Sequence, residues 1–389
     1  MYKRKWVFGA ACAGMFLFGI TFITLGSVVP GLKEKYHLSE TSAGTLFSLL
    51  PFGILAGSLL FGPICDKYGY KIVLSISCFC ICAGLEGIAF APSLLVLKAC
   101  ICLFGLGGGA INGATNAVVA DISEKDKGAS LSLLGVFFGI GALGMPLLLA
   151  ILGHAFHFEM ITAFVGLITC LAGLGFLFIR FPLPKQSQGF PIAHSFHLVK
   201  DNVLLLIAFF LFCQSSFEAV INNWTTTYLS KKLFIPADKA LYALSLYVVG
   251  MTAMRLLLGS FLKAVPVKNL LITSFALLLA GCFCLEFADT FYIAVAGLLL
   301  LGAGLAGGFP IMLGMVGHRY AAISGTAFSF VLVIALLGNT LVNYGMGIVV
   351  DHYGIGYLTK IAFLESIIML LLTIFILRRI TKQQTQTII

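Results

Sequence analysis

The residues best suited to chemistry lie in a polar stretch, residues 214 to 229, that falls within an otherwise apolar segment. Gln214, Glu218 and Asn222 follow one another at four-residue intervals, so a helix places them on one face. Glu218 falls near the middle of the segment, where an unpaired carboxylate is very costly in hydrocarbon and desolvation favours its protonated form. We expect Glu218 to bind a proton or a sodium ion. The alternative is a purely structural hydrogen bond.

Two pairs of asparagines extend this polar set. Asn112 and Asn116 lie four residues apart, and so do Asn339 and Asn343. A carboxamide both donates and accepts hydrogen bonds, which suits a ligand rich in hydroxyl groups; the alternative is hydrogen bonding between helices. Trp224 offers an aromatic face for the C–H face of a sugar, or else an anchor at the membrane interface.

A charged turn at residues 62 to 71 separates two long apolar segments. Its sequence is Gly62-Pro-Ile-Cys-Asp66-Lys67-Tyr-Gly69-Tyr-Lys71. Gly62 allows a neighbouring helix to approach closely, and Gly69 allows a tight turn. Asp66, at a helix end, can pair with a cation or with the N-terminus of another helix. We therefore expect a breakable contact, a latch, at this turn.

Three further ionisable residues fall inside apolar segments. Glu86 and Glu365 lie toward the outer ends of their segments, and we expect both side chains to extend to the membrane surface. Arg255 lies in the cytoplasmic half of its segment. It either reaches the inner surface or meets a carboxylate, and Asp66 is one such partner.

The composition requires these residues to be placed by membrane-spanning helices. The 389-residue chain is 60% hydrophobic and 10% charged, whereas a soluble domain carries about 25% charge. Its apolar segments are each long enough to cross about 30 Å of hydrocarbon as a helix, which satisfies its own backbone there. We predict an all-α membrane protein of twelve helices, at residues 6–30, 41–62, 72–91, 94–120, 128–152, 159–180, 203–228, 240–262, 269–288, 290–317, 323–349 and 357–379.

The chain also contains an internal repeat with an offset of 197 residues. This offset pairs Gly53 with Gly250, Gly62 with Gly259, Gly84 with Gly281, Gly105 with Gly302, Gly107 with Gly304, Gly128 with Gly325 and Gly141 with Gly338. Random placement predicts roughly two such pairs instead of seven. We expect a six-helix bundle at residues 1–180, a cytoplasmic linker at 181–200 and a second six-helix bundle at 201–389.

The placement of basic residues predicts the orientation in the membrane. Of the 24 Lys and Arg residues, sixteen lie on the same side as the two termini and seven on the opposite side, with Arg255 inside a span. This bias places both termini in the cytoplasm of a multi-pass protein of the inner or plasma membrane. The net charge of +9 is then explained by topology and by contact with anionic lipid, and not by nucleic-acid binding.

The charged turn, the twelve spans and the repeat together resemble the major facilitator superfamily over the whole chain. The turn is similar to that family's signature between its second and third helices, with Lys67 where Arg is more common. In the second copy, Lys263 stands at the position of the acidic residue. The resemblance implies two bundles that rock about a central binding site. We expect Asp66, Lys67, Lys71 and Arg255 to act in gating.

Two segments resemble the fucose permease-like (fucose/galactose/glucose) sugar symporter branch of that superfamily. One is the Phe-Gly-x-Gly-Ala run that ends at Ala142, and the other contains Glu218, Trp224 and a Tyr-Leu pair at 228 and 229. Gly135 stands where that branch commonly has His, and Met145 interrupts its Gly-Pro pair. These departures leave the identity of the sugar open.

The resemblance implies a secondary active transporter of a neutral sugar or polyol, coupled through Glu218 to proton or sodium entry. The expected substrate-binding residues are Asn112, Asn116, Gln214, Asn222, Trp224, Asn339 and Asn343. We expect a monomer without a cofactor or metal and, since no nucleotide-binding motif or catalytic set is present, no enzymatic activity. The alternatives are an exporter of drug-like or amphiphilic solutes and a non-transporting sensor.

Overall fold

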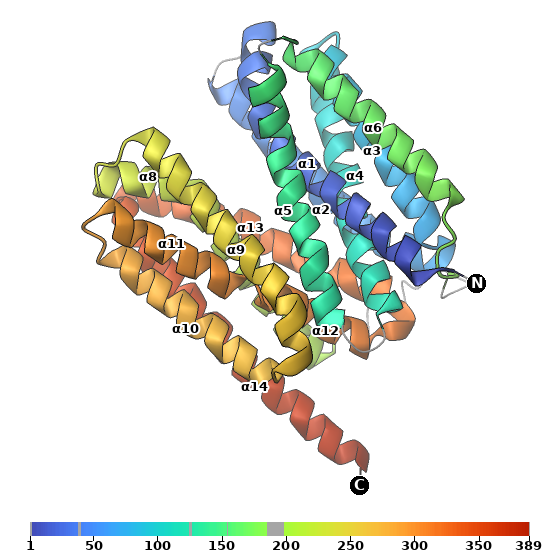
Figure 1. Ribbon diagram of the computed structural model, residues 1–389, viewed down its shortest axis with the longest axis vertical. Helices are drawn as coiled ribbons and strands as arrows, with labels where there is room; N and C mark the ends of the chain where they lie inside the picture. Colours follow the sequence, from blue (N-terminus) through green and yellow to red (C-terminus); the bar gives the residue numbers. More distant parts are fainter. Residues whose placement is uncertain (1, 38–39, 124–126, 154, 185–197, 389) are drawn as a thin grey trace. The chain divides into compact units, whose positions relative to one another are not determined.

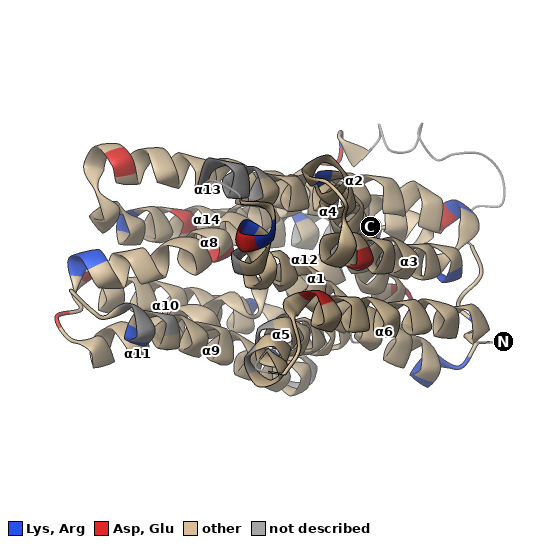
Figure 2. Cartoon of the chain, turned by 90° about the horizontal axis from the view of Figure 1, so that it is seen from above, with Lys and Arg blue, Asp and Glu red and all other residues tan. Residues whose placement is uncertain are grey.

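The computed structural model describes residues 2–37, 40–123, 127–153, 155–184 and 198–388. Within these ranges the chain is helical and contains no strand (Figure 1). Twelve segments there are long and apolar enough to cross a membrane, and most of the ribbon carries no charge (Figure 2). The prediction of an all-α membrane protein with twelve spanning helices is confirmed.

The predicted spans recur in the structure with adjusted ends. The helices of the first half are α1 (Arg4–Tyr36), α2 (Glu40–Tyr68), α3 (Tyr70–Phe90), α4 (Leu94–Ile122), α5 (Lys127–Leu152) and α6 (Phe158–Phe178). Those of the second half are α8 (Asn202–Lys232), α9 (Ala237–Ala264), α10 (Val267–Glu286), α11 (Phe291–Leu305), α12 (Gly308–Arg319), α13 (Ser324–Tyr353) and α14 (Leu358–Ile388). Helix α1 continues beyond its expected end at residue 30, and the tenth span is divided between α11 and α12.

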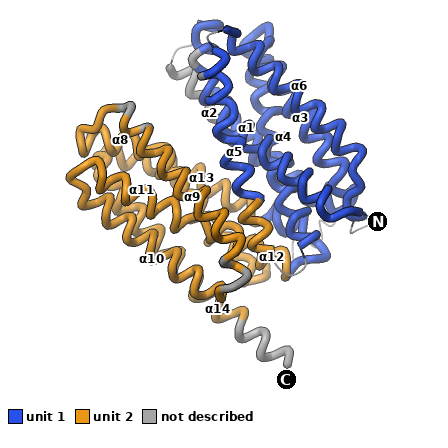
Figure 3. The backbone as a smooth tube through the Cα atoms, in the orientation of Figure 1, with its two compact units in different colours: residues 1–124, 134–195, 319–330 blue, residues 125–133, 196–318, 331–389 orange. Residues whose placement is uncertain are grey.

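The described chain forms two compact units (Figure 3). The first comprises Met1–Glu124, Leu134–Ser195 and Arg319–Phe330, and the second comprises Lys125–Leu133, Phe196–His318 and Val331–Ile389. Helices α5 and α13 therefore contribute residues to both units. Most of the expected linker, residues 185–197, lies outside the described residues.

The two units have related internal packing. In the first unit, α4 packs against α1, α2 and α3, and α3 also packs against α6. In the second unit, α11 packs against α9 and α10, and α14 packs against α8 and α10. By the repeat, α9, α10 and α11 are the counterparts of α2, α3 and α4. Helix α11 thus packs against the counterparts of two neighbours of α4.

Close backbone contacts recur at the spacing of the repeat. A Cβ atom added to Gly105 would lie 2.6 Å from the Leu50 carbonyl oxygen, and one added to Gly302 would lie 2.2 Å from the Tyr247 carbonyl oxygen. Both members of the second contact lie 197 residues after those of the first. Only glycine permits helices to approach so closely, so the same packing is built twice. These contacts support the predicted duplication.

A lysine contact recurs with the same offset. Lys35 donates to the Ala89 carbonyl at 2.6 Å and forms an ion pair with Glu159 at 3.4 Å. Lys232 donates to the Glu286 carbonyl at 3.2 Å and pairs with the Glu286 carboxylate at 3.3 Å. The two lysines and the two accepting carbonyls are each 197 residues apart. The contact ties the first helix of each half to its third.

Two exposed residues test the predicted orientation. Leu183 and Phe234 are each 87% exposed, and the charge bias predicts that they lie on opposite sides of the membrane. An impermeant thiol reagent applied to intact cells is expected to label Phe234→Cys but not Leu183→Cys until the membrane is permeabilised. The unsubstituted protein, with its eleven free cysteines, supplies the background. Labelling of Leu183→Cys in intact cells above that background contradicts the orientation.

Candidate functional site

Glu218 on α8 is half-buried and interacts electrostatically with Arg255 on α9. The Tyr247 side chain, fully buried on α9, lies close enough to interact with both charges. Its hydroxyl has no hydrogen-bond partner among the described residues. The second unit therefore places an acid, a base and a phenol together within a membrane span.

The sequence pattern offered Asp66 as one carboxylate partner of Arg255 and assigned no role to Tyr247. Tyr247 and Arg255 lie eight residues apart in one helix, so they share a face. That spacing was visible in the sequence. The sequence does not show that this face packs against α8, because periodicity alone does not identify the neighbouring helix.

Polar side chains also join α8 to α13 within the second unit. The Trp224 indole Nε1 donates to the Asn343 Oδ1 at 2.9 Å, and the Asn339 amide donates to the Ser215 carbonyl at 3.4 Å. Trp224, Asn339 and Asn343 are half-buried, as is Asn222 on the same helix as Trp224. The structure thus brings together Trp224 and Asn343, two of the expected substrate-binding residues, in a direct hydrogen bond.

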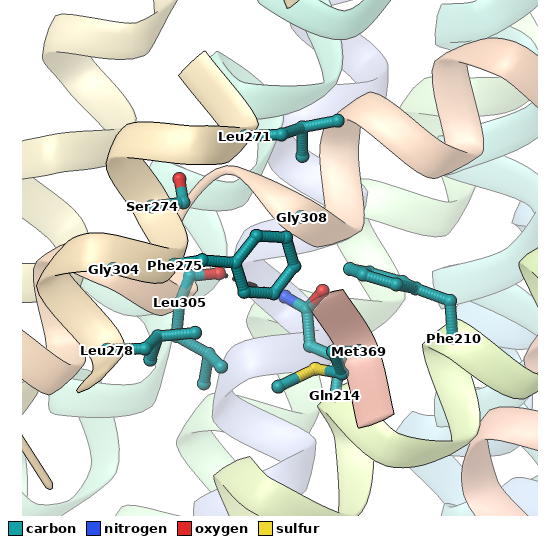
Figure 4. Close-up of a pocket in the computed structure, with 10 residues that line it drawn as sticks. All are labelled: Phe210, Gln214, Leu271, Ser274, Phe275, Leu278, Gly304, Leu305, Gly308 and Met369. Atoms are coloured by element: carbon teal, nitrogen blue, oxygen red, sulfur yellow. Dashed lines mark hydrogen bonds between the residues drawn. The ribbon is translucent and has the colours of Figure 1, made fainter. Parts of the chain in front are cut away.

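Gln214 lies in a different environment, although it shares a helix with Trp224. It is 1% exposed, and its amide donates at 2.9 Å to the carbonyl of Leu305, the last residue of α11. The interruption between α11 and α12 frees that carbonyl from helical bonding, and Gln214 satisfies it. Gln214, Phe210 and Met369 line a cavity of about 10 Å³. Figure 4 shows these side chains. This contact supports the helix break and is separate from the Trp224–Asn343 pair.

The asparagine pair of α4 is internally bonded in the first unit. The Asn116 amide nitrogen donates to the Asn112 main-chain carbonyl at 2.9 Å and to its Oδ1 at 3.0 Å. Asn116 is 5% exposed, whereas Asn112 is half-buried. Asn112 is therefore the more accessible member, and Asn116 orients it.

The charged turn holds the N-terminus of α13 within the first unit. The Asp66 carboxylate, 1% exposed, accepts hydrogen bonds from the Gly325 backbone N–H at 3.2 Å and the Thr326 backbone N–H at 2.9 Å. The Thr326 hydroxyl donates to it at 2.6 Å. A Cβ atom added to Gly62 would lie 2.6 Å from the Gly325 carbonyl oxygen, so the helices meet closely, as predicted. Of the expected partners for Asp66, the structure shows a helix N-terminus.

A second carboxylate extends this contact. Asp121 of α4 accepts a hydrogen bond from the Tyr70 hydroxyl and another from the Ser324 hydroxyl at 2.8 Å. Asp121 is not among the residues that the sequence predicted to act in gating. Of the two basic residues of the turn, Lys67 has its ammonium group over the Tyr68 ring, and Lys71 is exposed. Two aspartates of the first unit, Asp66 and Asp121, thus accept hydrogen bonds from the start of α13.

Comparison with known proteins gives a family match over most of the chain. The family model described as Major Facilitator Superfamily matches residues 11–242 and 221–388. Among curated relatives, the glucose/mannose transporter GlcP of Bacillus subtilis (strain 168) is 23% identical over 361 residues, which cover 89% of this chain and 88% of that protein.

Solved structures of sugar symporters share the fold. The fucose:proton symporter FucP of E. coli matches with a TM-score of 0.80 at 18% identity, covering 95% of this chain and 98% of that one. The proton:xylose symporter XylE matches with a TM-score of 0.79 at 15% identity, covering 96% of this chain and 95% of that one. At these identities the likeness shows the fold alone.

Proposed function

Because the chain belongs to the major facilitator superfamily, we propose that this multi-pass membrane transporter moves a neutral sugar or polyol by alternating access, coupled to proton entry. The observation that carries the substrate class is the hydrogen bond between Trp224 and Asn343. It places an aromatic face beside a carboxamide on two helices of one unit. An aromatic ring packs against the C–H face of a sugar while a carboxamide exchanges two hydrogen bonds with its hydroxyls.

Other carboxamides complete the proposed binding set. Asn222 and Asn339 supply further donors and acceptors within the second unit, and the first unit by itself presents Asn112, oriented by Asn116. Uncharged polar groups of this kind suit a neutral, hydroxyl-rich solute better than a large apolar cation. The names of GlcP, FucP and XylE point to the same class of substrate.

Glu218 is the proposed coupling group. When Glu218 is ionised it attracts Arg255, and when it takes up a proton that attraction is lost. Proton binding therefore changes the interaction between α8 and α9, and α8 also carries Trp224. A sugar that binds to the protonated form stabilises it, and opening toward the cytoplasm rehydrates the carboxyl and releases the proton. FucP and XylE are proton symporters, which favours the proton over sodium as the coupling ion.

Asp66 is the proposed gating group, since it can hold the start of α13 in one conformation and release it in another. Asp66→Asn removes the negative charge from a site that accepts three hydrogen bonds. We expect the conformational equilibrium to shift by about 1–3 kcal/mol, or about 5- to 150-fold. Distance measurements between spin labels on the two units report this shift directly.

The exposed Asp351 at the other end of α13 provides a matched control. Asp351→Asn makes the same chemical change outside the latch and is expected to leave the label distances unchanged. An Asp66→Asn protein with the distance distribution of the unsubstituted protein shows that this carboxylate does not set the equilibrium.

A thermal-shift screen of the purified protein tests the substrate class. Glucose, mannose, fucose and xylose are compared with amphiphilic cations. A ligand present at 100 times its dissociation constant stabilises the folded state by about 2.7 kcal/mol. We expect at least one sugar to raise the melting temperature and the cations to have no effect. Stabilisation by the cations alone supports the exporter hypothesis instead.

A further inference from the structure

Glu365 of α14 lies inside the second unit, so the expectation that it extends to the membrane surface is wrong. Its side chain is 6% exposed, because α14 packs against both α8 and α10. Glu86, for which the same expectation was made, is half-buried. Glu365 is thus a deeply buried carboxyl to which the proposed transport mechanism gives no role.

The Glu365 carboxyl group is the first of three hydrogen-bonding groups in a row, and the other two belong to α8. Its Oε1 lies within hydrogen-bonding distance of the Ser216 hydroxyl, which is itself fully buried. The same hydroxyl lies 2.9 Å from the Cys213 carbonyl oxygen. The second carboxyl oxygen, Oε2, is buried and has no hydrogen-bond partner among the described residues.

The number of protons available to these three groups determines whether Glu365 is protonated. A serine hydroxyl has one proton to donate. If Glu365 is ionised, its carboxylate and the Cys213 carbonyl compete for that proton, and Oε2 is left as part of a buried charge. If Glu365 is protonated, it donates to Ser216, and Ser216 donates to the Cys213 carbonyl. Only the protonated form satisfies both bonds.

The surroundings of Glu365 do not favour the ionised form. In the part of the chain that the structure describes, the titratable groups that face it are two thiols, Cys213 from α8 and Cys282 from α10. Ser366, next to it on α14, donates to the carbonyl of Ala362 in its own helix. Two neutral thiols cannot balance a negative charge in a low-dielectric interior.

We infer that Glu365, Ser216 and the Cys213 carbonyl form a proton-binding site between α14 and α8, distinct from the Glu218–Arg255 pair. The bound proton allows Glu365 to act as a hydrogen-bond donor that joins the two helices. Its loss leaves an unbalanced charge in the interface and loosens α14 from α8. The site thus makes the packing of α8, which carries Glu218 and Trp224, responsive to proton concentration.

Infrared spectroscopy of the purified protein in lipid nanodiscs tests the inference. At neutral pH we expect a carboxylic-acid C=O band that disappears in Glu365→Gln and persists in the control Glu86→Gln. Ser216→Ala removes the acceptor of the Glu365 proton, so the same band is expected to shift in frequency without disappearing. This shift identifies the band even if Glu365→Gln does not fold.

The opposite spectrum overturns the inference. If Glu365→Gln removes a carboxylate band and no acid band, Glu365 does not hold the proton. If Ser216→Ala leaves every acid band in place, Glu365 does not donate to Ser216, and the proposed site is wrong. A pH series gives an independent readout. The melting temperature of the unsubstituted protein is expected to fall as the pH rises from neutral to alkaline, and Glu365→Gln to lose this component. Equal pH profiles for the two proteins also contradict the site.

Discussion

Replacing Glu218 by Gln is expected to abolish uphill accumulation of the substrate while leaving its binding and exchange intact. The amide keeps the size and hydrogen-bonding capacity of the protonated carboxyl but cannot gain or lose a proton. The transporter then cycles with substrate alone, and a proton gradient no longer drives it. Proteoliposomes loaded with unlabelled sugar measure exchange, and an imposed pH gradient measures accumulation.

Glu86→Gln is the matched control because it makes the same change in another membrane helix, at a half-buried residue outside the proposed site. It is expected to accumulate substrate as well as the unsubstituted protein does. Accumulation by Glu218→Gln equal to that of Glu86→Gln means that Glu218 is structural and that any coupling uses another group. Glu365 is then the next residue to examine.

Disrupting the Trp224–Asn343 pair is expected to cause the largest loss of substrate affinity. Asn343→Leu removes two hydrogen-bonding groups from the proposed site and leaves the Trp224 N–H without its acceptor. Trp224→Phe keeps an aromatic face but removes that donor. Each change is expected to weaken binding by about 1–3 kcal/mol, or about 5- to 150-fold. Isothermal titration with the sugar identified by thermal shift measures the effect.

Asn223 provides the control for these substitutions because it adjoins Trp224 on α8 and is exposed. Asn223→Leu makes the same chemical change as Asn343→Leu, but at an exposed residue of α8. It is expected to leave the affinity for the sugar unchanged. If Asn343→Leu and Trp224→Phe bind the sugar as tightly as Asn223→Leu does, the site lies elsewhere.

Sequence predicted the features of this fold that depend on local chemistry. The apolar segments gave the spans because hydrocarbon accepts only backbones that satisfy their own hydrogen bonds. The paired glycines gave the repeat because close packing restricts those positions to the smallest residue, as at Gly105 and Gly302. The positive φ of 84° at Gly69 likewise follows the expected tight turn.

The side-chain contacts that the sequence did not predict depend on which helices pack against each other. Gln214 and Glu218 share a face by spacing, yet Gln214 bonds to the end of α11, because the break after Leu305 frees a carbonyl there. The position of Glu365 toward the outer end of its apolar segment predicted a side chain that reaches the membrane surface. The sequence pattern does not reveal that α8 covers this side chain, because burial depends on how the helices of the unit pack together.

Uptake into proteoliposomes tests whether the protein carries out coupled transport of a neutral sugar. The purified protein is reconstituted in proteoliposomes, and uptake of the sugar that stabilises it is followed with an inward proton gradient and without one. We predict accumulation above the external concentration with the gradient, and equilibration alone when a protonophore is added. A protein that binds the sugar but shows neither accumulation nor exchange, under proton or sodium gradients, is a sensor and not a transporter.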